Sequence, residues 1–210
     1  MERSQSSRTA ASAMVVWDLG GVLAPSGRAL VALAGELGVA ESELAGPYWA
    51  DRDAYDLGGE SEAYWRAVVG GLGRALGEGE AARLDRIDTD SWAALAPESA
   101  ALLARLAEGG VPLGVLSNAP SSLARRVRAA AWSADFETLV FSSDLGLMKP
   151  DPDIYRAAGE KFGRAASEVV FFDDRPENVA AARAHGWRAH VWTGAEAGAA
   201  VLVREGVLGG

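Results

Sequence analysis

The sequence predicts an α/β fold in which helices wind a parallel β-sheet and a small helical unit is inserted near the N-terminus. Short, almost wholly apolar strands alternate with helical patterns from about residue 98 to the end of the chain. Residues 28–92, in contrast, show helical spacing with no strong strand candidate. With 49% apolar and 23% charged residues, the 210-residue chain can bury a substantial core.

The first strand is predicted at residues 14–18, where the apolar run MVVWD ends in an aspartate and enters the glycine-rich stretch LGGVLAP. The polar residues 1–12 before it lack an apolar segment and are expected to form a flexible tail, not a signal peptide. Residues 25–93 follow as the inserted helical unit, and residues 13–24 and 94–210 together form the sheet-containing core.

The second half of the chain alternates regularly between helix and strand. Helices are expected at 98–110, 121–131, 152–163 and 176–186, followed by a last C-terminal helix, and strands at 111–117, 138–142, 168–174 and 188–192. This alternation is typical of right-handed crossovers in a parallel sheet. Continuous apolar stretches such as VVFF indicate that helices cover both faces of the sheet.

The composition excludes several kinds of site and partner. No cysteine is present, so disulfides, thiolate zinc sites and a thiol nucleophile are excluded. The two histidines, His185 and His190, do not lie beside a nucleophile signature and are expected to be packing or surface residues. A net charge of −9 argues against nucleic-acid binding, and no apolar run is long enough to span a membrane.

Polar side chains fall at the ends of several predicted strands. Asp18, Ser117 and the pair Asp173 and Asp174 each lie at a carboxyl end, and Lys149 lies in a neighbouring loop. Ligands bind in the crevice outside the carboxyl ends of an open parallel sheet. Because adjacent carboxylates repel one another, the aspartate pair needs a cation or a helix N-terminus beside it. Asp174 could also serve as the N-cap of the helix that begins at Pro176.

Four motifs occur in order: VVWDLGGVL, VLSN, GLMKPDPDIY and FFDDRPEN. On these motifs, over about residues 14–194, the chain resembles the haloacid dehalogenase-like (HAD) hydrolase superfamily, in the subfamily whose helical cap is inserted after the first strand. The resemblance implies a Rossmann-like parallel core with residues 25–93 as the cap. The DLGGVL form of the first motif is similar to that of sugar-phosphate phosphatases.

The resemblance implies a role for each motif residue. It makes Asp18 the nucleophile that forms an aspartyl-phosphate, a route that divides one difficult displacement into two easier ones. The phosphoryl group would be held by Ser117, Asn118, Gly21 and Lys149, with Lys149 also paired with the nucleophile. Mg²⁺ would be bound by Asp18, Asp174, the Gly20 carbonyl and, less directly, Asp173, since this ion prefers hard oxygen ligands.

Gly20 departs from the pattern of the family's phosphatases, where the second residue after the nucleophile is usually an aspartate that protonates the leaving group. Such general acid catalysis contributes ~10²–10⁴ in rate. A good leaving group, a water acting as acid, or a donor from the cap would have to replace it. A Gly20→Asp substitution is therefore expected to speed hydrolysis of esters with poor leaving groups, if protonation limits turnover.

The function predicted on this basis is Mg²⁺-dependent hydrolysis of a small phosphomonoester, such as a sugar phosphate, by a cytoplasmic monomer or homodimer. One alternative is a 2-haloacid dehalogenase, which uses the same nucleophile without metal; the retained Asp173 and Asp174 argue against it. A phosphomutase is disfavoured because Gly20 cannot return a proton. The remaining alternative is a phosphate-binding module with little or no turnover.

The cap is expected to supply substrate selectivity. Its aromatic residues are expected mostly in the cap core, the usual place for aromatics at helical spacing; they are Tyr48, Trp49, Tyr55, Tyr64 and Trp65. Part of the ADRDAYDLGGES segment is expected to face the crevice and close over the substrate. Arg52 within it is expected at the surface, and Arg175 is expected either to offset the neighbouring aspartates or to be solvated.

Overall fold

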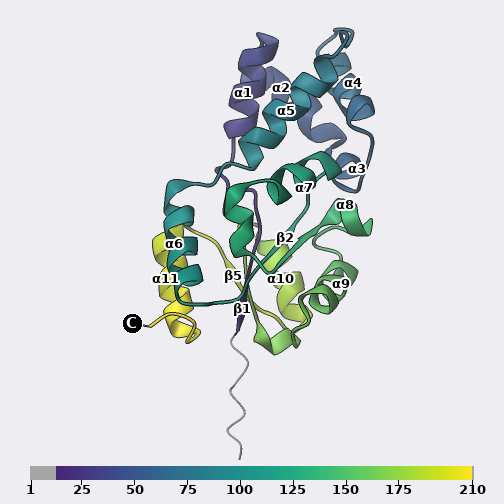
Figure 1. The fold of residues 1–210 in the computed structure, drawn as a ribbon. Helices are drawn as coiled ribbons and strands as arrows, with labels where there is room; N and C mark the ends of the chain where they lie inside the picture. The colour runs from purple at the N-terminus through teal and green to yellow at the C-terminus, as the bar shows by residue number, and fades with distance from the viewer. Residues whose placement is uncertain (1–12, 210) are drawn as a thin grey trace, which may run out of the picture.

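The computed structural model describes residues 13–209, which contain one five-stranded sheet with all strands parallel, in the order β3-β2-β1-β4-β5 (Figure 1). The strands are β1 (Met14–Trp17), β2 (Leu113–Ser117), β3 (Thr138–Phe141), β4 (Val169–Asp173) and β5 (Arg188–Val191). The predicted α/β fold and its five strands are confirmed. The predicted tail, residues 1–12, lies outside the described residues.

Side chains of the central strand point alternately to two apolar layers, as expected for a strand covered on both faces. Val15 and Trp17 belong to one buried cluster and Met14 and Val16 to the other. The helices that cover the faces are α6 (Pro97–Glu108), α7 (Ser121–Arg128), α9 (Pro152–Phe162), α10 (Pro176–Ala184) and α11 (Ala195–Arg204). This two-sided covering explains why the strands are almost continuously apolar.

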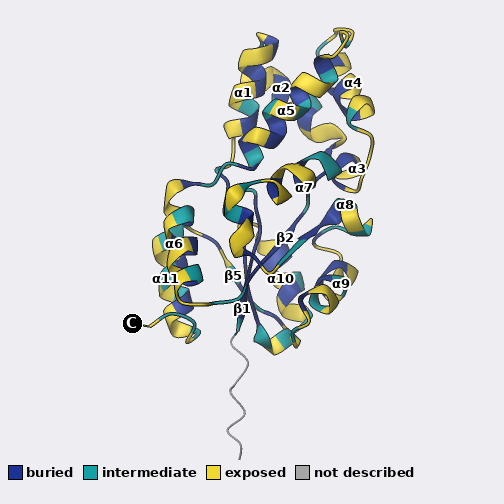
Figure 2. Cartoon of the chain, viewed as in Figure 1, coloured by how far each residue is buried: buried dark blue, intermediate teal, exposed yellow. Residues whose placement is uncertain are grey.

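The inserted segment is helical, as the spacing predicts, and it has an apolar cluster of its own. Its helices are α1 (Arg28–Leu37), α2 (Glu41–Ala50), α3 (Arg52–Asp56), α4 (Ser61–Gly71) and α5 (Glu80–Trp92). Leu33, Leu44, Trp65 and Leu84 are fully buried between them. In Figures 1 and 2 these helices lie at one end of the molecule, beyond α7 and the short helix α8 (Ser142–Leu145), with exposed residues on their outer sides. The cap boundaries at 25 and 93 stay predictions.

Some short elements were not predicted from the sequence. The helix α8 (Ser142–Leu145) begins directly after β3, and 3₁₀ helices occur at Ala131–Asp135 and Ala166–Glu168. Each is too short to show a helical repeat in its apolar residues. Between residues 13 and 209, no helix is both long and apolar enough to cross a membrane.

Candidate active site

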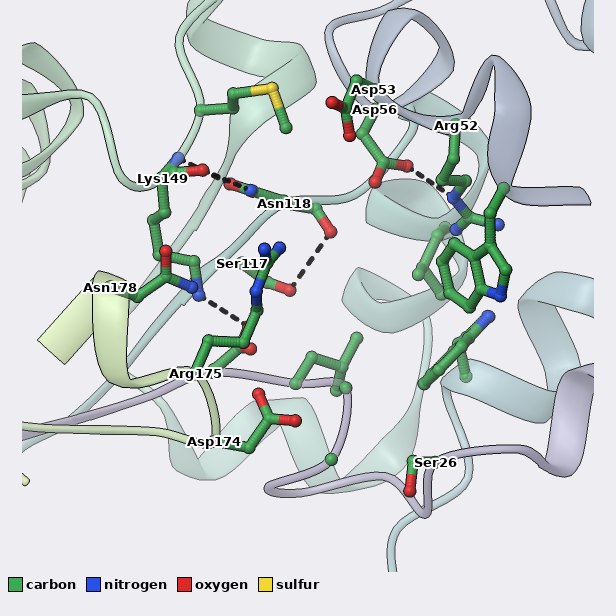
Figure 3. A pocket seen from close by; sticks show the side chains of 18 of the residues that line it. Ser26, Arg52, Asp53, Asp56, Ser117, Asn118, Lys149, Asp174, Arg175 and Asn178 are labelled. Atoms are coloured by element: carbon green, nitrogen blue, oxygen red, sulfur yellow. Dashed lines mark hydrogen bonds and ion pairs between the residues drawn. The ribbon is translucent and has the colours of Figure 1, made fainter. Parts of the chain in front are cut away.

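A cavity of about 340 Å³ is lined by residues from the carboxyl edge of the sheet and from the cap (Figure 3). The sheet side contributes residues from four of the motifs, which are Asp18, Ser117, Asn118, Lys149 and Asp174. The cap side contributes Trp49, Arg52, Asp53, Asp56 and Trp92. The fold therefore brings the predicted polar residues into one cavity, as the position of the strand ends indicated.

Asp18 and Lys149 form a buried ion pair at the base of the cavity. Lys149 Nζ lies 2.8 Å from an oxygen of Asp18 and 2.6 Å from an oxygen of Asp173. Burial raises the pKa of Asp18 to about 6, although the Lys149 ammonium acts in the opposite direction. Burial also acts to lower the pKa of Lys149, but Asp18 and Asp173 outweigh it and raise that pKa. Lys149 is therefore a fixed cation held between two carboxylates.

Asp173 is fully buried, and both of its oxygens are already in hydrogen bonds. Besides Lys149, the donors are the Arg175 backbone amide at 2.9 Å and the Asn178 side-chain amide at 2.9 and 3.1 Å. The Arg175 side chain is exposed at the edge of the cavity, which it lines, and it pairs with Glu177. Asp173 thus positions Lys149 and the start of α10, and it has little capacity left for a further ligand.

Asp174 differs from Asp173 because its carboxylate is exposed at the cavity. The N-cap of α10 is Arg175 and makes no side-chain capping bond, so the alternative reading of Asp174 as a cap does not hold. Gly21 lies against it with φ +74°, and a Cβ at Gly21 would collide with an oxygen of Asp174. Because Gly21 has no Cβ, the Asp174 carboxylate can lie directly against the loop that follows Asp18. The Gly21 amide itself donates to the Ala24 carbonyl at 2.8 Å.

Ser117 is the last residue of β2, and Asn118 follows it. The Ser117 hydroxyl lies in the cavity wall, and its only hydrogen bond among residues 13–209 is a long one, 3.5 Å, to the Asn118 carbonyl. The Asn118 side chain is engaged on both sides with Lys149: its nitrogen donates to the Lys149 carbonyl at 2.9 Å and its oxygen accepts from the Lys149 amide at 2.8 Å. Asn118 thus fixes the lysine loop, while Ser117 remains available to a ligand.

Three carboxylates and one ammonium meet at this wall. Asp18, Asp173 and Asp174 each offer an oxygen within 4.8 Å of the other two. Burial and the nearby Asp173 raise the pKa of Asp174, as expected where negative charge accumulates. With Lys149 as the one ammonium among them, two negative charges are in excess when all three carboxylates are ionised. A divalent cation with a preference for oxygen ligands fits this arrangement in charge and in donor type.

The cap wall carries a charged cluster that sequence reasoning missed. Arg52 was expected at the surface, but it is only 5% exposed, and the prediction is wrong. Its guanidinium donates to Asp56 at 2.8 Å, to the Tyr48 hydroxyl at 2.5 Å and to Asp88 at 3.1 Å. It also lies over the ring of Tyr48, 5.2 Å from the centroid. Asp88 is 36 residues further along the chain, so no local pattern could reveal the burial.

The cap aromatics divide into core and cavity residues. Tyr48, Tyr55, Tyr64 and Trp65 are buried, as predicted, whereas Trp49 is half exposed and lines the cavity. The histidines take no part in the site. His190 pairs with Glu205 at 2.8 Å, and His185 packs near aromatic rings of the second core layer; these are the packing and surface roles expected.

Comparison with known proteins places this geometry in a family. Among curated relatives, a phosphatase of Mycobacterium tuberculosis is 36% identical over 126 residues, covering 57% of this chain and 57% of the relative. A phosphoglycolate phosphatase of Rhodospirillum rubrum is 33% identical over 126 residues, 55% of this chain and 52% of the relative. The chain thus spans little more than half the length of these relatives.

Solved structures show the same fold at low identity. A HAD family enzyme of Bacteroides thetaiotaomicron, in complex with magnesium and inorganic phosphate, aligns with a TM-score of 0.65 and 19% identity over 87% of this chain and 95% of that one. An L-2-haloacid dehalogenase of Xanthobacter autotrophicus, with chloropropionic acid covalently bound, aligns with a TM-score of 0.70 and 20% identity over 94% of this chain and 85% of that one.

A family model described as haloacid dehalogenase-like hydrolase matches residues 13–186, which include the sheet edge, the cap and every motif residue of the cavity. The chain belongs to the haloacid dehalogenase-like hydrolases.

Proposed function

We propose that this protein is a Mg²⁺-dependent phosphatase that hydrolyses a small phosphomonoester through an aspartyl-phosphate on Asp18. The observation that carries the proposal is the arrangement of Asp18, Lys149 and Asp174 around one cavity, with two negative charges in excess. Asp18 is the nucleophile, and Lys149 orients it while offsetting charge on the phosphoryl oxygens. Relatives named as phosphatases agree with this reaction class.

Asp18, Asp174 and the Gly20 carbonyl would hold Mg²⁺, and Asp173 would stabilise the site from behind because its oxygens are already bonded. When bound, the ion would neutralise charge on the phosphoryl group. Ser117 and the backbone amide of Asn118 would hold the phosphoryl oxygens. Gly21 would contribute by admitting Asp174, since its amide is bonded to Ala24 in this structure.

The cap wall favours an uncharged leaving group. Asp53 and Asp56 face the cavity there, and Arg52, the one cation among the described cap residues that line it, is already paired with two carboxylates. A leaving group with its own carboxylate, as in phosphoglycolate or phosphoserine, would be repelled. A neutral, hydroxyl-rich group could donate to these carboxylates and pack on the exposed ring of Trp49, which is compatible with a sugar phosphate.

The excess negative charge also distinguishes this function from metal-free dehalogenation, because a haloacid substrate carries a carboxylate that the uncompensated site would repel. The likeness to dehalogenase structures concerns the fold alone. Dehalogenation is therefore not proposed, and halide release is measured below as the alternative outcome.

The test measures phosphate release from monophosphates of uncharged sugars, from phosphoglycolate, from phosphoserine and from para-nitrophenyl phosphate. Each is measured with Mg²⁺ and with chelator. We expect phosphate release to depend on metal and to be fastest with the monophosphate of an uncharged sugar. In Asp18→Asn the release should fall to background. Asp90→Asn is the matched control, since this exposed carboxylate pairs with Arg126 at the surface. If no ester releases phosphate, and 2-haloacids release halide in the presence of chelator, the protein is a dehalogenase and the proposal is wrong. Phosphate binding without release of either product would favour the binding module.

A further inference from the structure

The space beside Gly20, two residues after the nucleophile, is occupied by the ring of Trp92, a residue of the cap. A Cβ on Gly20 would lie 3.0 Å from one ring carbon of Trp92, which is tighter than most side-chain contacts, and 3.5 Å from the next, which is an ordinary contact distance. The Trp92 ring is held in place because its Nε1 donates to the Tyr48 hydroxyl at 2.9 Å. A side chain at position 20 would therefore crowd the indole, which would have to shift by a few tenths of an ångström. Because position 20 is glycine, any proton donor comes from another element.

Few ionisable groups of the cavity can give up a proton. The Lys149 ammonium is held between Asp18 and Asp173, and arginine guanidiniums stay protonated. Asp18 and Asp174 belong to the nucleophile and metal positions. Among the residues that line the cavity, this leaves the two cap carboxylates, Asp53 and Asp56, both on α3.

Asp56 belongs to a cluster with more carboxylates than cations. Arg52 is shared between Asp56 and Asp88, and both carboxylates are at least nine-tenths buried. Asp88 is fully buried and also accepts from the Tyr48 hydroxyl at 2.6 Å, so its charge is well compensated. Among residues 13–209, the other titratable groups that interact with Asp56 are Asp53 on its own helix and Tyr64 on α4. Burial raises the pKa of Asp56 to about 6, although Arg52 acts to lower it.

The Asp56 carboxyl is oriented toward the substrate space and held there. One oxygen accepts from Arg52, and Figure 3 shows the other pointing away from Arg52 into the cavity. The Asp56 backbone carbonyl accepts from the Ser142 hydroxyl at 2.5 Å, which itself accepts from the Ala119 amide at 2.9 Å. Ala119 lies two residues after Ser117. Through Ser142, α3 is therefore hydrogen-bonded to the loop that carries the proposed phosphate-binding residues.

We propose that Asp56, from the cap, is the general acid and base of this active site and replaces the side chain that Gly20 lacks. This proposal rests on the phosphatase function proposed above. In the first step an Asp18 oxygen attacks phosphorus and the ester P–O bond breaks. Its electron pair goes to the leaving oxygen, which takes the Asp56 proton, and Arg52 stabilises the resulting carboxylate.

The second step restores both carboxylates. A water oxygen attacks phosphorus and gives its proton to the Asp56 carboxylate. The bond between phosphorus and the Asp18 oxygen then breaks, its electron pair returns to Asp18, and inorganic phosphate leaves. Asp56 is again protonated and ready for the next ester.

The experiment compares kcat/KM for the best alkyl phosphate of the panel and for para-nitrophenyl phosphate, in wild type and Asp56→Asn, with Mg²⁺. Asparagine keeps the shape and can still accept from Arg52, but it has no proton to give. We expect a loss of ~10²–10⁴ for the alkyl ester, which needs an acid, and of less than about tenfold for the aryl ester, which does not. Acid catalysis by Asp56 further predicts that wild-type kcat/KM for the alkyl ester falls as pH rises above about 6 relative to the aryl ester, and that Asp56→Asn removes this difference.

Asp90→Asn is the control, because Asp90 is an exposed carboxylate that pairs with Arg126 and does not line the cavity. It is expected to leave the ratio of the two kcat/KM values unchanged. An equal loss for both esters in Asp56→Asn would overturn the assignment of Asp56 but not the phosphatase function. The same holds if the ratio changes in Asp53→Asn, the other cap carboxylate of the cavity, and not in Asp56→Asn. A wild type that releases no phosphate from either ester would overturn both.

Discussion

The two walls of the cavity hold their charges in different ways. On the sheet wall, Lys149 is shared by Asp18 and Asp173, and Asp173 accepts further hydrogen bonds from Arg175 and Asn178. On the cap wall, Arg52 is likewise shared by two carboxylates, Asp56 and Asp88. In both, one cation serves two buried anions, but the sheet wall adds a third carboxylate, Asp174, whereas the cap wall leaves one oxygen of Asp56 facing the cavity.

This difference indicates how excess negative charge is used. The sheet wall has two charges in excess and suits a divalent cation. In the cluster of Arg52, Asp56 and Asp88 on the cap wall, one negative charge is in excess, and a single proton can neutralise it. The pKa of Asp56, which lines the cavity, is raised to about 6. On the function proposed above, the metal and the proton would be held by two separate carboxylate clusters, one at the sheet edge and one on the cap helices, and not by a single motif.

The largest effect is expected from breaking the cap cluster with Arg52→Met. Two buried carboxylates would lose their shared cation, and removing one partner of a buried pair costs about 3–5 kcal/mol in free energy of unfolding. The loss should be greatest near pH 8 and smaller near pH 5, where Asp56 takes up a proton. Urea unfolding at both pH values measures it.

Arg66→Met is the control for this substitution, because Arg66 pairs with Glu62 on α4 with both side chains about two-thirds exposed. Exposed pairs of this kind contribute about 0.5 kcal/mol or less. If Arg52→Met lowers the free energy of unfolding by as little as Arg66→Met, the two buried carboxylates do not depend on Arg52. The cap wall would then not be a cluster in which one cation stabilises two buried anions.

A smaller effect, with a definite pH dependence, is expected for Asp18→Asn in chelator. The pKa of Asp18 is raised to about 6 in the folded protein from 3.8, so its native state holds the proton more tightly than the unfolded chain does. Stability from this group is present below about pH 4 and is lost as pH rises through 6. The variant should be more stable than wild type by about 1–3 kcal/mol at pH 8, and the gap should close toward pH 4.

Urea unfolding of both proteins across pH 4–8 tests this, and Asp90→Asn should show no such trend because Asp90 is exposed. Adding Mg²⁺ should stabilise the wild type more than the variant, since only the wild type keeps the Asp18 ligand. A variant less stable than wild type at pH 8 would mean that the Lys149 pair outweighs the cost of burying Asp18.

The sheet wall could be predicted from the sequence because its residues are marked locally. Asp18 and Asp173 end apolar runs, and the carboxyl ends of parallel strands meet at one edge. The cap wall could not be predicted in this way. The RDAYD segment of α3 has the composition of a surface helix, and one of the carboxylates that bind the buried Arg52 is the distant Asp88 on α5. Ser142, which bonds the cap to the core, lies on a four-residue helix too short for any periodicity.

Gly20 shows how the two kinds of information combine. The sequence marks it as a departure and predicts a gain in rate from Gly20→Asp. The structure adds the reason why glycine occupies the position: the Trp92 ring lies where a Cβ would point. A gain from Gly20→Asp is therefore expected only when Trp92 is also made smaller.

The smallest predicted effect tests this contact alone. Gly20→Ala should cost about 1 kcal/mol in free energy of unfolding, because the added methyl forces the Trp92 ring to move. In a Trp92→Leu background the cost should vanish, giving a coupling energy of about 1 kcal/mol between the two positions. Gly35→Ala on α1 is the control, since nothing lies within 4 Å of its added Cβ and alanine favours a helix there. Costs that are equal in both backgrounds would place the strain in the Gly20 backbone, and Trp92 would then not explain the missing aspartate.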